Sequence, residues 1–323
     1  MFVFSLIIPV YNRPDELEEL LNSLTNQIFD SEKISFEVII IEDGSTQKAD
    51  SIVDSFKQKL KIDYFFKENT GQGFSRNVGF ERAKGDYFIV FDSDCIIPEQ
   101  YLQTVSEHLQ TSKLDAFGGP DKAHKSFTAI QKAISYAMTS LFSTGGIRGN
   151  KKSAEKFKPR SFNMGISRKV FEKVGGYKIT RMGEDIEFSI RIEKNGFKIG
   201  LIPDAFVYHK RRTNFFQFYK QLHFFGRARI NISRFFSDEL KLVHLFPAFF
   251  TLSFLFLPIS FLIYFPIGVI GSSVFLLYFL LIFSDAIYQT KNIYVAFLSV
   301  FAVLVQLLGY GIGFLTELLS KKR

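Results

Sequence analysis

Two aspartates separated by one residue, Asp92 and Asp94, follow an apolar run at residues 87–91. A continuous apolar run of this length is typical of a buried parallel strand. In open α/β sheets, ligands collect beyond the carboxyl ends of such strands. Mg²⁺ and Mn²⁺ prefer oxygen ligands and are often shared between carboxylates and substrate phosphates. This pair of aspartates therefore indicates a divalent-cation site that also holds a diphosphate.

Polar residues also follow two earlier strands of the predicted sheet. Tyr11-Asn12 comes after a strand at 2–10, and Glu42-Asp43 after a strand at 36–41. The turn after the first strand is not glycine-rich, and the chain has no Walker lysine loop, so dinucleotide and P-loop sites are disfavoured. An aromatic ring beside Asn and Asp instead suits a nucleobase and its ribose, through stacking and hydrogen bonds. The two aspartates that follow the third strand would then hold the metal-bound diphosphate.

These residues need a sheet that brings the three strand ends to one edge. Apolar periodicity predicts helices between the strands and beyond them. The alternation of strands and helices predicts an α/β fold, with a mostly parallel sheet covered by helices. The remaining predicted elements are helices at 15–26, 49–60, 71–84 and 98–109, and strands at 62–66 and 198–202.

Composition narrows the class of protein. The chain has 323 residues and a formal net charge of +8, with a single cysteine, Cys95, which excludes an internal disulfide and fits a reducing compartment. Eight of the basic residues lie at 208–241, directly before a long apolar region. That position is typical of a juxtamembrane anchor rather than of a nucleic-acid surface, so no nucleic-acid partner is expected.

The last third of the chain has the composition of a membrane region. Residues 242–265 carry no charge apart from His244, and residues 293–315 carry none. Both reach the ~20 residues that a crossing helix needs. Residues 267–283 are shorter and form either a further span or the return arm of a re-entrant hairpin that turns at 265–268; buried soluble helices are the other alternative. Residues 1–10 are too short for a signal peptide and are interpreted as the first strand.

At this point the chain resembles a known family. It is similar to family 2 inverting glycosyltransferases of the GT-A fold, whose sheet is Rossmann-like and mostly parallel. The resemblance covers residues 2 to about 230, and as a set its motifs are specific. They are Pro9-Val10-Tyr11-Asn12, Glu42-Asp43-Gly44-Ser45, Gly71-Gln72-Gly73-Phe74-Ser75-Arg76-Asn77, Phe91-Asp92-Ser93-Asp94, Asn163-Met164-Gly165 and Gly183-Glu184-Asp185 with Arg191 and Gly196 following.

The resemblance implies a nucleotide-sugar donor, Mg²⁺ or Mn²⁺ as cofactor, and inversion at the anomeric carbon. It places Asp94 on the metal, with Asp92 on the metal, its bound water or the ribose. His209, which follows the last predicted strand, is either a further metal ligand, a phosphate contact or a structural histidine. For Arg76 a surface salt bridge is the alternative to a donor contact. The residues expected to bind the donor are Pro9, Tyr11, Asn12, Asp43, Arg76 and Asp92.

Inversion by direct displacement requires a base that takes the proton of the acceptor hydroxyl. The resemblance assigns this role to Asp185, with Glu184 in support or in acceptor binding. Both residues stand where a helix is expected to begin, so an acidic helix cap is the alternative interpretation.

We expect three parts: a catalytic domain at 1–207, a basic and aromatic interfacial segment at 208–241 and a membrane region of two to three helices at 242–323. The interfacial segment is predicted to form a helix at 214–231, and an ordinary helix packed on the domain is its alternative. With the basic cluster beside the first span, the catalytic domain is expected to face the cytoplasm, at the inner membrane. Three crossings, which we favour over two, place Lys321-Lys322-Arg323 on the far side.

The favoured function is a membrane-anchored glycosyltransferase that acts on a lipid-linked or membrane-proximal acceptor in cell-surface glycan synthesis. Processive polysaccharide synthases carry a Gln-x-x-Arg-Trp motif, and this chain has no Trp, which favours transfer of one sugar per acceptor. A polyprenyl-phosphate sugar synthase is the alternative enzyme, and a catalytically inactive membrane scaffold of the same fold is the alternative outside catalysis. The sequence leaves the donor sugar, the linkage and the oligomeric state open.

Overall fold

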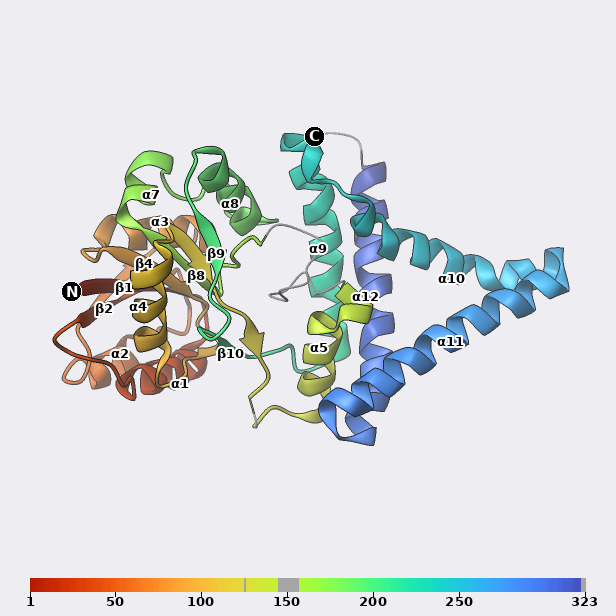
Figure 1. The fold of residues 1–323 in the computed structure, drawn as a ribbon, viewed down its shortest axis with the longest axis horizontal. Coiled ribbons are helices and arrows are strands. Elements are labelled where there is room, and N and C mark those ends of the chain that lie inside the picture. The colour runs from red at the N-terminus through yellow and green to blue at the C-terminus, as the bar shows by residue number, and fades with distance from the viewer. Residues whose placement is uncertain (125, 145–156, 321–323) are drawn as a thin grey trace. The chain divides into compact units, whose positions relative to one another are not determined.

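The computed structural model describes residues 1–124, 126–144 and 157–320 (Figure 1). The chain forms two compact units. The first contains Met1–His124 and Glu155–Lys210, and the second contains Lys125–Ala154 and Arg211–Arg323. The predicted division at 1–207, 208–241 and 242–323 stays a prediction. It assigns the helix formed by Ala129–Thr139 to the catalytic domain, whereas this helix lies in the second unit.

The first half of the first unit confirms the predicted α/β alternation. Strands β1, β2 and β4 have their central residues buried, which explains their continuous apolar runs. All strand pairs among β1 to β4 are parallel. The elements are β1 (Phe2–Val10), α1 (Pro14–Thr25), β2 (Ile34–Asp43), α2 (Asp50–Phe56), β3 (Ile62–Lys67), α3 (Gln72–Arg82) and β4 (Tyr87–Phe91).

The second half of this unit completes the sheet in the order β3-β2-β1-β4-β8-β6-β9. Strand β8 runs antiparallel to both of its neighbours, and β6 and β9 pair in parallel. A small second sheet has the order β5-β10-β7. The elements are β5 (Cys95–Ile96), α4 (Tyr101–Ser112), β6 (Ala116–Gly118), β7 (Asp121–Lys122), β8 (Asn163–Ser167), α7 (Arg168–Val174), α8 (Glu184–Lys194), β9 (Ile199–Leu201) and β10 (Val207–His209).

Asn163, the first residue of β8, is a structural residue. Its side chain is fully buried, accepts a hydrogen bond from the Tyr101 hydroxyl at 2.6 Å and donates one to the Ala205 carbonyl at 2.8 Å. These bonds tie the start of β8 to α4 and to the loop before β10. The motif that begins at Asn163 therefore connects β8 to the loop that leads into β10, the strand that carries His209.

The second unit is helical. Helix α9 lies along α12, and α5 packs on α12 as well (Figure 1). Within the described residues, three helices are long and apolar enough to cross a membrane, at Leu242–Ile263, Phe265–Thr290 and Ile293–Leu319. The elements are α5 (Ala129–Thr139), α6 (Leu141–Thr144), α9 (Phe215–Phe235), the short 3₁₀ turns η1 (Ser237–Glu239) and η2 (Leu242–Leu245), α10 (Phe246–Ile263), α11 (Phe265–Thr290) and α12 (Ile293–Leu319).

Candidate active site

The sheet brings the three predicted strand ends together. Strand β1 lies between β2 and β4 and runs parallel to both. Their carboxyl ends therefore meet at one edge, where Tyr11-Asn12, Glu42-Asp43 and Asp92-Ser93-Asp94 emerge.

Asn12 connects two of these strand ends. Its carbonyl oxygen Oδ1 accepts hydrogen bonds from the backbone N–H of Thr46 at 2.8 Å and of Gln47 at 3.0 Å, and its own N–H donates to Ser45 Oγ at 2.8 Å. The residue has a φ of 52°, a left-handed conformation that Asn tolerates better than most residues. Asn12 thus orders the turn after β2, and its contact with a donor stays a prediction.

Asp43 orders the loop before α3. Its carboxylate accepts hydrogen bonds from Lys67 Nζ and from the backbone N–H groups of Thr70 at 2.9 Å and Gly71 at 3.0 Å. Burial opposes ionisation of Asp43, but the bonds from Lys67 and Thr70 outweigh it and hold the pKa of the carboxyl below its ordinary value. The neighbouring Glu42 is fully buried and accepts from Ala49 N–H at 2.9 Å, so it faces the interior.

Tyr11 is the predicted donor residue with the most accessible side chain. It is 52% exposed at the end of β1, directly after the strand that contains half-buried Pro9. An exposed ring at the ligand edge of the sheet is available to stack on a base, whereas Asn12 and Asp43 already have partners in the protein. The assignment of these residues to the donor stays a prediction.

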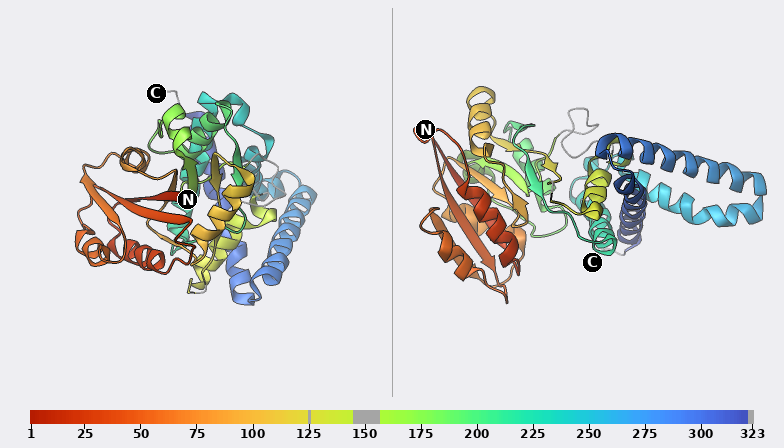
Figure 2. Two further views of the ribbon diagram at one scale, coloured as in Figure 1. Left: turned by 60° about the vertical axis from the view of Figure 1, so that its left-hand side comes forward. Right: turned by 90° about the horizontal axis from the view of Figure 1, so that it is seen from below.

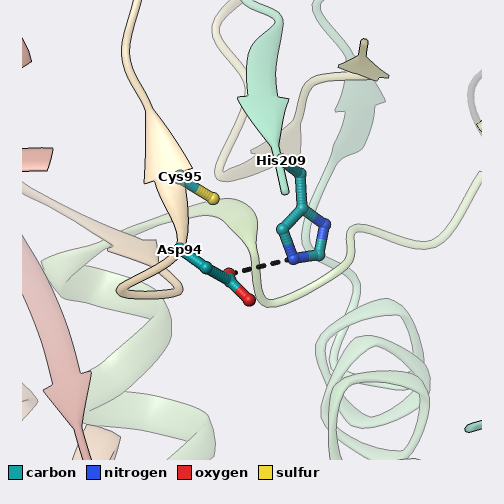
Figure 3. Close-up of side chains that lie close together, drawn as sticks. All are labelled: Asp94, Cys95 and His209. Carbon is teal, nitrogen blue, oxygen red and sulfur yellow. Dashed lines mark ion pairs between the residues drawn. The ribbon is translucent and has the colours of Figure 1, made fainter. Parts of the chain in front are cut away.

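Asp94 lies at the centre of a group of ligating atoms (Figure 3). Its Oδ1 is 3.1 Å from His209 Nε2, and its Oδ2 accepts a 2.6 Å hydrogen bond from Arg13 Nη1. The His209 ring stacks on Phe162 with centroids 4.9 Å apart, which fixes its orientation. Cys95 Sγ completes the group, whose ligand atoms lie within 4.8 Å of one another.

The donor set fits a divalent cation. Carboxylate oxygen suits both Mn²⁺ and Mg²⁺, whereas imidazole nitrogen is a ligand of transition-metal ions and favours Mn²⁺ of the two. The side chains of Asp94 and His209 are only 9% and 14% exposed. Burial raises the pKa of the Cys95 thiol well above its ordinary value, so the sulfur stays protonated and is a poor ligand. Asp92, predicted beside Asp94 on the metal, lies outside this group of three.

Asp92 is instead joined to the first turn of α8 through Arg76. The Arg76 guanidinium is fully buried, with Nη2 2.8 Å from Asp92 Oδ1 and Nη1 3.3 Å from Glu184 Oε1. The ring of Tyr177 lies 5.5 Å from the guanidinium carbon. Burial alone would lower the pKa of Arg76, but the charges of Asp92 and Glu184 reverse this effect and keep the side chain charged. Arg76 is therefore a link between β4 and α8, and its predicted contact with the donor stays untested.

Glu184 and Asp185 differ in environment. Glu184 is buried, accepts a hydrogen bond from Gln72 Nε2, and has its pKa raised by burial and by the neighbouring charge of Asp185. The Asp185 side chain is 17% exposed. One of its oxygens accepts from the N–H of Ile186 at 2.8 Å, and the other lies 3.7 Å from Arg160 Nη1. One Asp185 oxygen thus contributes to capping α8 and the other faces Arg160, and the role of Asp185 as the base stays a prediction.

Arg13 and Arg160 are the residues that sequence reasoning missed. Arg13 follows Tyr11-Asn12 directly, so its place after the first strand was a usable signal. Arg160 lies outside every motif, and only the fold brings it to Asp185.

Comparison with known proteins agrees with this geometry. The family model described as "Glycosyl transferase family 2" matches residues 5–175, just over half of the chain. A probable glycosyltransferase of Sulfolobus acidocaldarius is 26% identical over 227 residues, which are 68% of this chain and 48% of the relative. The poly(ribitol-phosphate) beta-N-acetylglucosaminyltransferase TarS of Staphylococcus aureus is 34% identical over 117 residues, 36% of this chain and 20% of TarS. The chain thus spans about half or less of the length of these relatives.

Two solved structures have the same fold. The mannosyltransferase PcManGT from Pyrobaculum calidifontis, in complex with GDP-Man and Mn²⁺, aligns with 99% of this chain and 88% of its own, at 14% identity and a TM-score of 0.58. TarS 1–349 in complex with UDP-GlcNAc aligns with 71% of this chain and 66% of its own, at 22% identity and a TM-score of 0.50. At these identities the likeness shows the fold alone. With the match to the family model, it confirms the predicted family and fold: the chain belongs to glycosyl transferase family 2 and has the GT-A fold.

Proposed function

We propose that the chain transfers a sugar, with inversion, from a nucleotide-diphosphate donor to a lipid-linked acceptor at a membrane surface, with a divalent cation as cofactor. The observation that carries this proposal is the link from Asp92 through Arg76 to Glu184. One buried guanidinium joins the strand end expected to hold the donor to the helix turn that carries Asp185. The strand end expected to hold the donor and the helix turn that carries the predicted base are therefore connected through one buried side chain.

The donor site begins at Tyr11, whose exposed ring would stack on the base. Asn12 and Asp43 fix the two turns that border it. The relatives in complex with GDP-Man and with UDP-GlcNAc support a nucleotide-sugar donor for this chain.

Asp94 and His209 would hold the cation, and Asp92 would reach it through water or bind the ribose. A divalent cation held by these residues would supply positive charge against the negative charge that develops on the departing diphosphate. The relative solved with Mn²⁺ supports the assignment of Mn²⁺ or Mg²⁺. Arg13, which donates a hydrogen bond to Asp94, would add a positive charge for the same phosphates.

Asp185 would take the proton of the acceptor hydroxyl. The acceptor oxygen then forms its bond to the anomeric carbon while the bond from that carbon to the diphosphate oxygen breaks, and the diphosphate leaves with the electron pair. Glu184 holds the first turn of α8 through Gln72 and Arg76. Asp185 would then act on the face of the sugar ring opposite to the departing diphosphate, as inversion requires.

The acceptor class follows from the second unit. Long apolar helices and the basic, aromatic α9 support a membrane location. Positive charge beside the first apolar helix favours a cytoplasmic catalytic domain at the inner membrane, where nucleotide sugars are made. A catalytic unit on a membrane anchor is best suited to an acceptor carried on lipid, in cell-surface glycan synthesis.

A polyprenyl-phosphate acceptor is the second candidate. Arg160 places a cation 3.7 Å from Asp185. A guanidinium at the acceptor side of the site suits a phosphate oxygen as nucleophile, which needs no strong base.

The test is a screen of radiolabelled nucleotide sugars against extracted membrane lipids and, separately, against polyprenyl phosphate. We expect Mn²⁺-dependent label on a lipid-linked sugar. If the native protein shows neither sugar transfer nor donor hydrolysis with any pair of nucleotide sugar and acceptor, the proposal is contradicted. Label on polyprenyl phosphate alone would establish the second candidate instead.

A further inference from the structure

Helix α9 cannot lie in the hydrocarbon core. Its basic residues are spread along its length rather than gathered at one end, and charged side chains near the middle of a bilayer are costly. Basic residues interleaved with aromatic ones are typical of a helix that lies in the plane of the interface. These basic residues are Lys220, Arg227, Arg229 and Arg234.

Helix α9 lies beside α12 over most of its length. The rings of Phe215 and Phe301 are 4.8 Å apart near the start of α9. Further along, the two backbones touch at glycines: a Cβ at Gly226 would lie 2.1 Å from the Tyr310 carbonyl oxygen, and one at Gly313 would lie 2.0 Å from that of His223. So close a fit holds the two helices together without room for lipid between them.

Glu317 joins the C-terminal ends of α9 and α12 by ion pairs. Its carboxylate binds Arg227 Nε at 3.0 Å and Arg234 Nη1 at 2.8 Å, and its side chain is 10% exposed. The polar Gln306 and Ser299 of α12 are also buried in the protein. Half of the apolar window of α12 is buried, against 22% for the window at Leu242–Ile263 and 11% for that of α11.

The other two apolar helices, α10 and α11, form a hairpin that extends away from α5, α9 and α12. Helices α10 and α11 run together away from α5, α9 and α12, across the direction of the α9–α12 pair (Figure 2, right). The 18 residues of α10 correspond to about 27 Å, close to the ~30 Å of a bilayer core. No Asp, Glu, Lys or Arg occurs at 242–284, so insertion of the hairpin moves no such charge across the membrane.

We infer that the chain crosses the bilayer twice, through the α10–α11 hairpin alone, and that α12 lies along the interface beside α9. This inference rests on the proposed membrane location. It replaces the three crossings expected from the sequence, where 293–315 counts as a span on length and composition. It also leaves the end of α12 on the side of the catalytic unit. Lys321-Lys322-Arg323, which follow α12, lie outside the described residues, and the positive-inside bias expects them on that side.

Cysteine labelling in sealed membrane vesicles of known orientation tests this topology. The single native cysteine is buried and is removed by Cys95→Ser, which gives a background without reactive thiols. Single cysteines are then placed at four exposed positions and treated with a membrane-impermeant maleimide. They are Gln58→Cys in the catalytic unit, Tyr264→Cys at the hairpin tip, Gln289→Cys near the end of α11 and Leu319→Cys at the end of α12.

We expect Gln58→Cys, Gln289→Cys and Leu319→Cys to label from one side and Tyr264→Cys from the other. Labelling of Leu319→Cys from the side opposite to Gln289→Cys would show that α12 crosses and would overturn the inference. Labelling of Tyr264→Cys from the catalytic side, or from neither side in intact vesicles, would contradict the inference that the hairpin crosses the bilayer.

Labelling in detergent gives the total reactive thiol of each variant, and Ile263→Cys replaces Tyr264→Cys if that variant does not fold. The labelling pattern does not depend on sugar transfer. The proposed topology can therefore hold even if the proposed acceptor is wrong, and the proposed acceptor can hold even if the topology is wrong.

Discussion

Arg13 Nη1 lies 2.6 Å from Asp94 Oδ2, on the same carboxylate whose other oxygen is 3.1 Å from His209 Nε2. The guanidinium thus stands next to the position expected for a divalent cation. The two positive charges repel each other, so cation binding has to overcome the Arg13 charge until a diphosphate arrives to neutralise both.

Arg13→Gln is therefore expected to tighten binding of Mn²⁺ in the absence of donor and to weaken binding of the donor. A unit charge and a divalent ion 4 Å apart interact by about 2 kcal/mol even in bulk water, which corresponds to a gain of about thirtyfold in Mn²⁺ affinity. A titration followed by the electron paramagnetic resonance signal of free Mn²⁺ measures this change in affinity. Arg82→Gln, which breaks the exposed pair with Asp63, is the matched control. Unchanged or weaker Mn²⁺ binding in Arg13→Gln would contradict this role.

Asp94→Ala is expected to abolish sugar transfer while leaving the protein folded. The cation held there contributes several kcal/mol to stabilising the leaving diphosphate, so the loss should reach about 10³-fold or more. Transfer from radiolabelled donor measures the loss, and far-UV circular dichroism checks the fold. Asp63→Ala, at an exposed ion pair on β3, controls for the removal of a carboxylate. Full activity of the native protein in EDTA would rule out a catalytic cation.

Asp185→Asn keeps the shape of the side chain and removes its proton affinity. Transfer to a hydroxyl acceptor should fall by ~10²–10⁴-fold, whereas donor binding should be retained. Glu193→Gln, at the other end of α8, is the control. If transfer is untouched, Asp185 is only a helix cap, and the phosphate acceptor becomes the better assignment.

Asp43 should make stability depend on acid pH. Its pKa in the folded protein is below the ordinary value of 3.8, so its stabilising contribution is present above that value and is lost as the pH falls through the folded value. Asp43→Asn should be less stable than the native protein near neutral pH, with a gap that narrows in acid. Thermal unfolding in detergent, followed by circular dichroism across this range, measures the gap. A gap that stays constant with pH would show that the charge of Asp43 contributes nothing to stability.

Gly313→Ala tests the packing of α9 on α12. The new Cβ would meet the His223 carbonyl oxygen at 2.0 Å, and backbone on both sides prevents easy relaxation. We expect a loss of stability of about 1–3 kcal/mol, seen as a lower unfolding midpoint in detergent. Gly271→Ala is the control, because its Cβ would meet only the flexible end of Leu257. Equal midpoints for the two variants would show that the α9–α12 contact is loose.

The first half of the fold was predictable because its strands are buried. Strand β1 was predicted at its observed bounds, since a parallel central strand must be apolar throughout. Strand β8 was missed because it is short and mixes polar and apolar residues. Its antiparallel place depends on pairing with β4, across more than 70 residues of sequence. Helix α5 was missed because its partners, α11 and α12, come at the end of the chain.

The candidate site shows the same difference between features that local sequence encodes and features that depend on long-range contacts. Asp94 and His209 were identified because each follows a predicted strand, and the structure brings them together. Arg76 was found through its motif, but its complete burial was not visible in the sequence. The salt bridge to Asp92 and Glu184 is internal rather than on a helix surface. Partners of this kind are set by tertiary contacts, which local pattern does not encode.

Helix α5 has a practical consequence for soluble fragments of this protein. Tyr136 of α5 donates a hydrogen bond to Asp285 of α11 at 2.6 Å, and Ile134 and Ala137 are buried in the core shared with α12. A fragment truncated before residue 242 would keep α5 and expose this apolar face, which invites aggregation. Such a fragment would lose activity for a reason unrelated to acceptor recognition. A soluble catalytic fragment should therefore end at Lys210 and replace Lys125–Ala154 with a short polar linker, so that both segments of the helical unit are removed together.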